Sequence, residues 1–307
     1  MKVALLAGGT GGTKLAHGFA MLAERAAVDL TVIANVGDDT EMHGLHVSPD
    51  VDALLYTLGG LMDAERGWGV RDDTHTAHAM FERYGEPTWF TIGDADLATD
   101  VVRTARLRDG ARLTDATAGM ARALGIRARI LPASDDPYRT LIETDAGTLP
   151  FQDYFVRLRQ EPEVRGVRSE GADHARPTTQ VLEAIEEADV VVIGPSNPIV
   201  SIGPILELPG VRQAVADAGQ TVAVSPIVAG RALKGPADRM LTSLGHESTA
   251  LGVARIYLGV VDRFVLDEAD AALAPEVEAL GMEAVVAPTV MRSDEDRAAL
   301  ARLLLGA

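Results

Sequence analysis

Short apolar runs alternate with helix-length amphipathic segments along most of the chain. An apolar run at 3–7 leads into a glycine-rich turn and a segment with helical spacing to residue 22, and a second apolar run covers 30–34. Continuous apolar runs separated by helices are typical of parallel strands that are buried on both faces. The first 35 residues therefore predict a β-α-β unit with two parallel strands.

The same pattern returns in the second half of the chain. Further apolar runs lie at 190–193, 221–224, 264–266 and 283–286, with helix-length segments between them. Alternation of this kind predicts an α/β fold, a Rossmann-like doubly wound parallel sheet. In such sheets ligands bind beyond the carboxyl ends of the strands.

The middle of the chain departs from this alternation. Residues 63–180 read as a mostly helical insertion that carries a small antiparallel element, within a single domain spanning 1–307. Asp94 and Thr114 are the expected caps of two of its helices. The expected elements are helices at 50–62, 72–84, 95–108 and 114–124, strands at 127–131 and 138–144, a return strand within 149–157, and a polar surface loop at 160–178.

The composition excludes several classes of function. The 307 residues include 45 Asp and Glu against 28 Lys and Arg, a net charge of −17, and no cysteine. The absence of cysteine excludes thiolate metal sites, iron–sulfur clusters and disulfides. The acidic balance argues against general nucleic-acid or anionic-membrane binding. Because no apolar run reaches the length of a membrane span, we expect a cytoplasmic protein.

The acidic residues are distributed unevenly. Residues 3–23, 190–206 and 218–237 contain no Asp or Glu, and two of the three lysines, Lys14 and Lys234, fall within these windows. Each window holds the end of a predicted strand and the loop that follows. The sequence is therefore compatible with one small phosphate site at the strand ends, in spite of the net charge.

The loop from Gly8 to Lys14 is the first candidate for that site. Glycines allow backbone conformations that turn successive N–H groups toward one anion, and the helix that follows adds positive charge at its N-terminus. The spacing matches neither G-x-x-x-x-G-K-[ST] nor G-x-G-x-x-G. The alternative is a tight strand–helix turn without a ligand.

Aspartates follow the second strand. Asp38 and Asp39 come directly after it, and Asp50 and Asp52 lie near the start of the next predicted helix. Paired carboxylates suit Mg²⁺, which binds one or two carboxylates and completes its shell with phosphates and water. One of them is instead a candidate general base. The alternative is a set of solvated loop and capping aspartates.

Two later loops offer neutral polar groups. The segment 194–204 combines two X-Pro turns with serine and asparagine side chains, and the segment 225–236 adds Arg231 and Lys234. Such loops are either rigid connectors or sources of hydrogen bonds to a ligand. The candidates in them are Ser196, Asn197, Ser201, Ser225 and Lys234.

Taken in order, these segments resemble a known family. Nine segments are similar to those of the 2-phospho-L-lactate transferase family, the CofD/FbiA type of coenzyme F-420 biosynthesis: G-G-T-G-G, N-V-G-D-D, S-P-D-V-D, R-G-W-G, I-G-D-A-D, A-S-D-D-P, F-Q-D-Y-F-V, G-P-S-N-P-I-V-S-I-G-P-I-L and S-P-I-V-A-G. The resemblance extends from Met1 to about Arg297, and its most specific part is the run from Gly194 to Leu206.

The resemblance implies a reaction. Such enzymes move a phospholactyl or phosphoenolpyruvyl group from a guanosine diphosphate-linked donor to the ribityl hydroxyl of the deazaflavin Fo (7,8-didemethyl-8-hydroxy-5-deazariboflavin). GMP is released, Mg²⁺ is required, and the family is often homodimeric. The sequence does not say which three-carbon group is moved.

The resemblance also assigns roles to residues. Asp50 is expected to accept the proton of the ribityl hydroxyl, and Mg²⁺ is expected at some of Asp38, Asp39 and Asp50. Asp94 and Asp96 are Fo-site candidates, although Ala95 replaces the arginine of the commoner form G-D-R-D. Further binding candidates are Gly8, Gly9, Thr10, Gly11, Gly12 and Lys14 for the diphosphate, Asn35 and Asp52, and Ser196, Asn197, Ser201, Ser225 and Lys234 for guanine, ribose or phosphate.

Two alternatives belong to other classes. A regulatory protein of the gluconeogenesis-factor type, which binds UDP-sugars, shares the glycine loop and the N-P-hydrophobic loop, and would not bind Fo. A NAD-dependent Rossmann oxidoreductase is disfavoured by the glycine spacing.

Overall fold

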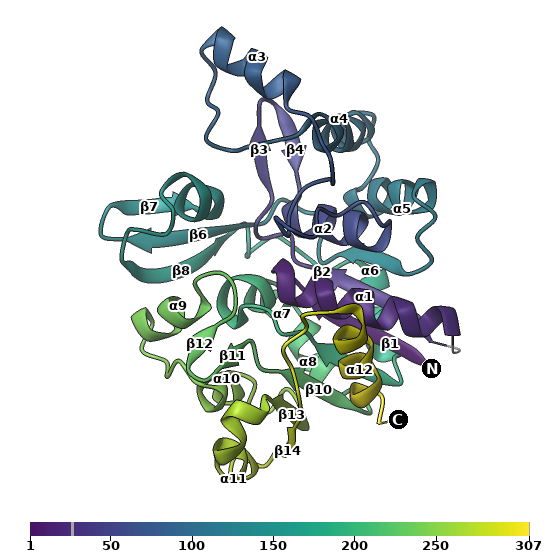
Figure 1. The fold of residues 1–307 in the computed structure, drawn as a ribbon, viewed down its shortest axis with the longest axis vertical. Coiled ribbons are helices and arrows are strands. Elements are labelled where there is room, and N and C mark those ends of the chain that lie inside the picture. Colours follow the sequence, from purple (N-terminus) through teal and green to yellow (C-terminus); the bar gives the residue numbers. More distant parts are fainter. Residues whose placement is uncertain (26–27, 307) are drawn as a thin grey trace.

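A seven-stranded sheet lies at the centre of the computed structural model, which describes residues 1–25 and 28–306 (Figure 1). Neighbouring strands are parallel throughout. In order across the sheet the strands are β14 (Glu283–Val286), β13 (Arg263–Leu266), β10 (Thr221–Val224), β9 (Val190–Ile193), β1 (Lys2–Ala7), β2 (Asp29–Ala34) and β5 (Arg129–Pro132). The predicted doubly wound α/β fold is confirmed.

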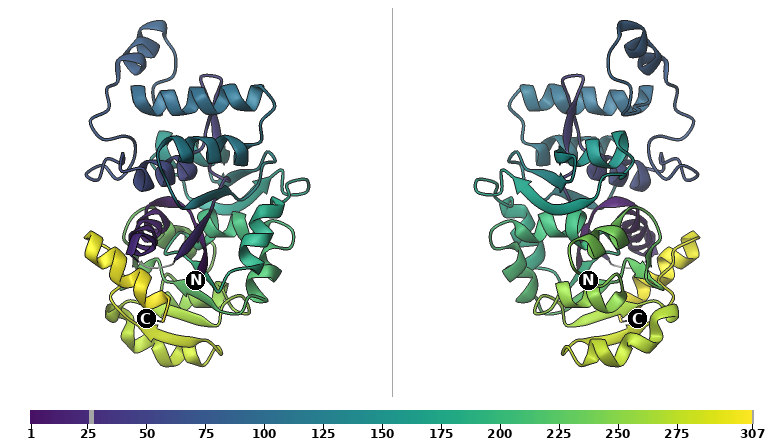
Figure 2. Two further views of the ribbon diagram at one scale, coloured as in Figure 1. Left: turned by 90° about the vertical axis from the view of Figure 1, so that its right-hand side faces the viewer. Right: turned by 90° about the vertical axis from the view of Figure 1, so that its left-hand side faces the viewer.

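Helices cover both faces of this sheet. In β1, Val3, Leu5 and Ala7 pack into one apolar cluster, whereas Ala4 and Leu6 pack into the other. Side chains alternate between the faces of a strand, so an uninterrupted apolar run serves both clusters. The first cluster includes α1 (Gly9–Arg25), α2 (Pro49–Leu58), α5 (Leu113–Ala123) and α12 (Asp294–Leu304), and the second α6 (Thr179–Glu186), α7 (Gly203–Glu207), α8 (Val211–Ala216), α10 (Ala250–Ile256) and α11 (Ala274–Glu278). Figure 2 shows α12 alongside α1, although the two helices are far apart in the sequence.

A smaller region stands on the β2 side of the sheet. The hairpin of β3 (Thr40–Met42) and β4 (Leu45–Val47) rises toward α3 (Thr76–Tyr84) and α4 (Asp94–Arg108) (Figure 1). The predicted helix 50–62 ends earlier, at Leu58, because Gly59 and Gly60 follow and terminate it. Within the described residues no helix has both the length and the apolar character that a membrane crossing requires.

The antiparallel element has three strands. β6 (Arg139–Thr144) lies between β7 (Gly147–Pro150) and β8 (Val164–Glu170). The polar segment 160–178 is thus not wholly a loop, because β8 pairs with β6. The predicted return strand 149–157 stops at Pro150, and Asp153–Arg157 forms a helical turn instead. β5, at the edge of the parallel sheet, also falls inside the range 63–180.

Two predicted helix caps are wrong. Asp94 lies inside α4, and its carboxylate accepts hydrogen bonds from the N–H groups of Thr76 and Ala77 at the start of α3. Thr114 lies inside α5 and donates to Asp135. The N–H groups at the start of α4 donate to Asp73, and the N–H of Thr114 at the start of α5 donates to Asp135. Each capping carboxylate is about 20 residues away in sequence, so local spacing does not reveal it.

Candidate functional site

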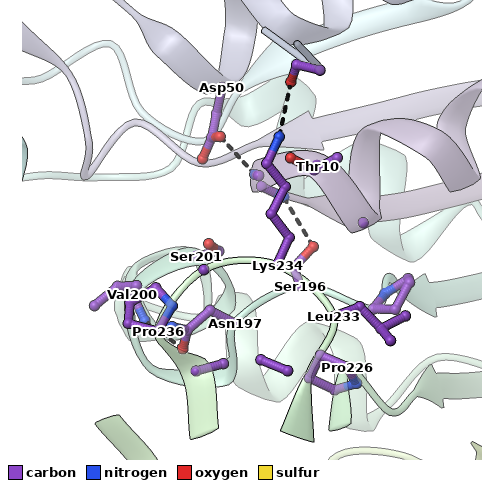
Figure 3. A pocket seen from close by; sticks show the side chains of 18 of the residues that line it. Thr10, Asp50, Ser196, Asn197, Val200, Ser201, Pro226, Leu233, Lys234 and Pro236 are labelled. Atoms are coloured by element: carbon purple, nitrogen blue, oxygen red, sulfur yellow. Dashed lines mark hydrogen bonds between the residues drawn. The ribbon is translucent and has the colours of Figure 1, made fainter. Parts of the chain in front are cut away.

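The candidate site lies where the direction of winding changes, between β1 and β9. From β1 the chain passes to β2 on one side, and from β9 it passes to β10 on the other. The loops at the carboxyl ends of two such strands leave a crevice between them. A cleft of about 740 Å³ opens here, and it is lined by the glycine loop after β1 and by Pro195, Ser196 and Asn197 after β9 (Figure 3).

The glycine loop is packed tightly against the loop that follows β9. The N–H of Gly8 donates to Ser196 Oγ over 3.3 Å, and Gly9 has a positive φ of 60°. A Cβ on Gly11 would collide with the backbone carbonyl of Pro195, and one on Gly12 would come within 2.8 Å of Ala7 Cβ. Close packing of the start of α1 against β1 and the loop after β9 thus explains Gly11 and Gly12 without a ligand. Gly8, Gly9, Thr10 and Gly11 nevertheless line the cleft.

A methyl group added to this packed loop is expected to lower stability. Gly11→Ala places a Cβ against the Pro195 carbonyl, so α1 or the loop after β9 must shift, at about 1–3 kcal/mol. The melting temperature should fall by several degrees in calorimetry. Gly219→Ala is the control, because a Cβ at Gly219 meets no atom within 4 Å. Equal melting temperatures for both variants would contradict the close packing.

Asp38 and Asp50 come together at the side of the cleft. The side-chain nitrogen of Asn35 lies 3.0 Å from Asp38 Oδ1 and 2.9 Å from Asp50 Oδ2. The other Asp50 oxygen accepts the N–H of Gly9 over 2.6 Å, at the N-terminus of α1 (Figure 3). Two carboxylates from different elements are thus held by one amide, while both line the cleft.

Burial disfavours negative charge on both of these carboxyl groups. It raises the pKa of Asp50 to about 6, and it raises the pKa of Asp38 well above its ordinary value. No ion pair within residues 1–25 and 28–306 joins either group to Lys or Arg. A pair of desolvated carboxylates without a cationic partner fits a hard divalent cation such as Mg²⁺. The described residues form no cluster of three or more His, Cys, Asp or Glu ligands, so further ligands would come from substrate and water.

The neighbouring aspartates are engaged elsewhere. Asp39 accepts from Ser48 Oγ over 2.6 Å and lies 2.9 Å from His46 Nε2. Asp52 is paired with the buried guanidinium of Arg103. Both carboxylates therefore lie beside the site and tie α2 to its surroundings.

The remaining acidic candidates lie outside the cleft lining. Asp94 caps α3, and its hydrogen bonds, led by the one from the Thr74 hydroxyl, lower its pKa to about 2. Asp96 accepts from Tyr56 Oη over 2.6 Å. Ala95 donates its backbone N–H to Asp73, so the position of the missing arginine carries a capping contact.

Two lysines, Lys14 and Lys234, line the cleft. Lys14 Nζ is 3.1 Å from the carbonyl oxygen of Met291, and Lys234 Nζ is 3.4 Å from those of Arg66 and Gly67. Burial lowers the pKa of both lysines. Figure 3 shows the extended side chain of Lys234, whose Nζ makes these contacts. Both ammonium groups lack a carboxylate partner among the described ion pairs.

The other polar candidates line the cleft and also shape its loops. Asn197 Oδ1 accepts from the N–H groups of Ile199 and Val200, and so caps the helical turn Pro198–Ile202. Ser225 Oγ donates to the Ile227 carbonyl, at the start of the hairpin of β11 (Ile227–Val228) and β12 (Arg231–Ala232). Ser196, Asn197, Ser201, Ser225 and Lys234 are therefore brought together, as predicted for loops at one sheet edge.

Four aromatic side chains, Trp68, Phe90, Phe151 and Phe155, line the cleft, and the three phenylalanines among them were not predicted as site residues. Phe151 and Phe155 stack with ring centroids 5.3 Å apart, and Phe90 and Trp68 line the same cleft. The stacking depends on the helical conformation that continues through Asp153–Arg157, because residues four apart are neighbours on a helix but lie about 13 Å apart along a strand. The signals in the sequence were the tryptophan of R-G-W-G and the two phenylalanines of F-Q-D-Y-F-V.

Comparison with known proteins identifies the family. The model of the family described as 2-phospho-L-lactate transferase CofD matches residues 3–298. The chain belongs to this family. It is 43% identical to a phosphoenolpyruvate transferase of Streptomyces griseus, over 99% of this chain and 98% of that protein. It is 40% identical to a 2-phospho-L-lactate transferase of Methanosarcina mazei, over 99% of each chain.

Solved structures support the fold. A Bacillus halodurans protein described as a member of the upf0052 family superposes with a TM-score of 0.66, at 17% identity and over 99% of both chains. Membership of the transferase family favours the transferase over the regulatory and oxidoreductase alternatives. Several segments that carry the family resemblance, including G-G-T-G-G, S-P-D-V-D, F-Q-D-Y-F-V and G-P-S-N-P, contribute residues to the cleft.

Proposed function

We propose that this protein moves a phospholactyl or phosphoenolpyruvyl group from a guanosine diphosphate-linked donor to the ribityl hydroxyl of Fo, with release of GMP, in coenzyme F-420 biosynthesis. One observation carries the proposal most strongly: a single cleft at the switch point of the sheet joins an anion-binding helix start, two buried carboxylates and an aromatic wall. A cleft of about 740 Å³ lies in the size range of pockets that bind small-molecule ligands.

The donor diphosphate is assigned to the glycine-loop side. The first N–H groups of a helix have no partner within that helix, and they carry part of its positive dipole. In α1 the first of them, from Gly9, serves Asp50, and we assign the following ones, from Thr10 and Gly11, to the diphosphate. Lys14 and Lys234 add two positive charges that the fold leaves facing the cleft.

Asp38 and Asp50 are the residues that would hold Mg²⁺. The ion would neutralise charge on the non-bridging phosphate oxygens. Asp50 is also our candidate to accept the proton of the ribityl hydroxyl, because its carboxyl group lines the cleft beside the start of α1, where the donor diphosphate is assigned. The aromatic wall of Phe90, Phe151 and Phe155 offers flat apolar surfaces on which the deazaflavin ring would stack.

The direct test is a transfer assay. The protein is incubated with Fo, Mg²⁺ and each guanosine diphosphate-linked donor in turn, and the products are identified by mass spectrometry. We expect a phosphodiester of Fo and stoichiometric GMP from at least one donor, and the mass of the product identifies the transferred group. No product from any donor overturns the proposal.

Lys234→Ala is expected to weaken donor binding. A charge-assisted hydrogen bond contributes about 1.5–3 kcal/mol, so the KM for the donor should rise about tenfold or more, with a smaller change in kcat. Lys2→Ala is the matched control, because Lys2 is paired with Glu187 at the start of β1. An unchanged donor KM in the Lys234 variant would argue against a role at the diphosphate.

A further inference from the structure

Asn35 is a buried polar residue that does not line the cleft, so contact with a substrate does not explain it. It follows directly after β2, its side chain is 0% exposed, and it lies beneath the cleft rather than in its lining. An amide in such a place must have its hydrogen bonds satisfied within the protein. Its nitrogen donates to the two carboxylates of the site and, over a longer 3.3 Å, to the carbonyl oxygen of Val200.

The orientation of this amide is fixed. Its oxygen accepts the N–H of Gly37 over 2.8 Å, which leaves the nitrogen to face Asp38 and Asp50. An amide nitrogen carries two hydrogens and no charge, so it can donate to two carboxylates without neutralising either. Lysine or arginine here would compete with a cation, and a second acceptor would repel the pair.

The carboxylates depend on Asn35 to different extents. Asp50 has a second anchor, the Gly9 N–H at 2.6 Å from its other oxygen. Among the described hydrogen bonds, Asp38 has only the one from Asn35 to its side chain. Loss of the Asn35 amide therefore frees Asp38 completely and Asp50 in part.

We propose that Asn35 is a positioning residue that orients the carboxylates of Asp38 and Asp50 toward one divalent cation, and so determines how tightly this site binds the cation. The inference rests on the proposed function for the identity of the cation as Mg²⁺. It does not depend on which group is transferred.

The test measures cation binding without substrates. Mn²⁺ serves as the probe, because its binding can be titrated by electron paramagnetic resonance. Replacement of residues that hold metal ligands in place typically costs 10- to 100-fold in affinity, and we expect a loss of about that size for Asn35→Ala. Ser134→Ala is the matched control, because Ser134 is also 0% exposed and bridges two groups, Arg176 and Asp136, away from the cleft. It should bind Mn²⁺ like the wild type.

Asn35→Ser gives a second measurement if Asn35→Ala does not fold. It keeps a short polar side chain at the buried position, but a hydroxyl has one hydrogen and cannot donate to both carboxylates at once. We expect a smaller upward shift of the melting temperature than in wild type on addition of Mn²⁺. Equal shifts in both proteins would contradict the proposal.

Kinetics separate positioning from a purely structural role. In the transfer assay, Asn35→Ala should raise the Mg²⁺ concentration needed for half-maximal rate about tenfold or more, while kcat at saturating Mg²⁺ falls less. A folded Asn35→Ala protein with unchanged Mn²⁺ affinity overturns the proposal. Wild-type protein that binds Mn²⁺ but yields no product with any donor contradicts the proposed function instead, so the two failures are distinguishable.

Discussion

Asp50→Asn is expected to reduce the transfer rate about a thousandfold or more while the protein remains folded. The substitution removes the proposed base and one of the two proposed cation ligands, and general-base catalysis alone contributes about 10²- to 10⁴-fold. The fold should tolerate the change, because a neutral amide at position 50 avoids burying a carboxylate that has no cationic partner. The rate is measured as GMP release, with the Fo product quantified by mass spectrometry.

Asp52→Asn is the matched control on the same helix. Asp52 is equally buried but faces Arg103, so its replacement should lower the melting temperature and leave turnover largely intact at 20 °C or below. The two variants thus have opposite signatures, one in rate and the other in stability. Undiminished GMP release from Asp50→Asn would rule out the proposed role of Asp50.

The fold was predictable because its central strands are buried on both faces. Val190–Ile193 is an uninterrupted apolar run with every residue buried, and Thr221–Val224, which is apolar after its first residue, is buried throughout as well. Such strands need no knowledge of their neighbours to be recognised. The smaller elements were harder, because β8 alternates exposed and partly buried residues and carries several charges, which resembles a surface loop.

The place of the site was predictable for a related reason. Parallel strands bring their carboxyl ends to one edge, so three acid-free loops distant in sequence had to meet there. The sequence did not decide which aspartates face the cleft. Asp38 and Asp39 are adjacent, and the one that turns away is selected by His46 and Ser48, which belong to the β3–β4 hairpin and the residue after it.

Helical geometry, in contrast, already separated Asp50 from Asp52. Both lie in the first turn of α2, and residues two apart on a helix point in directions about 200° apart. Only one of them can face the cleft. Asp52 faces Arg103, which lies 51 positions further along the chain, so no local sequence pattern predicts this contact.

Arg103→Met is expected to be the most destabilising substitution of those considered. The side chain of Arg103 is fully buried and donates to Asp52, to Asp100 over 2.8 Å and to the carbonyl of His46 over 3.0 Å. Breaking a buried ion pair from one side costs about 3–5 kcal/mol, because the remaining charge stays buried without a partner. The melting temperature should fall by roughly 5–10 °C in calorimetry at pH 8.

The stability lost in Arg103→Met should depend on pH, whereas the loss caused by a cavity alone would not. Burial raises the pKa of Asp52 to about 6 and that of Asp100 to about 8 even with Arg103 present, and without the guanidinium both must rise further. The folded variant then takes up these protons at higher pH than the folded wild type, whereas both unfolded chains have carboxyl pKa values near 4. The stability that the variant loses relative to wild type should therefore be largest above pH 8 and recover as the pH falls toward about 6.

Two further variants decide whether the charges, rather than the lost volume, cause the effect. Adding Asp52→Asn and Asp100→Asn to Arg103→Met removes the unpaired charges and should restore most of the stability at pH 8. Arg112→Met, which breaks the exposed pair with Asp115 and a longer contact of 3.9 Å with Asp135, should change the melting temperature little. Arg103 in α4 joins Asp100 of the same helix to Asp52 of α2. If Arg103→Met lowers the free energy of unfolding by less than about 1 kcal/mol, without pH dependence, these ion pairs do not stabilise the packing of α4 against α2. A loss that the two asparagines do not reverse would assign the role of Arg103 to packing instead of charge.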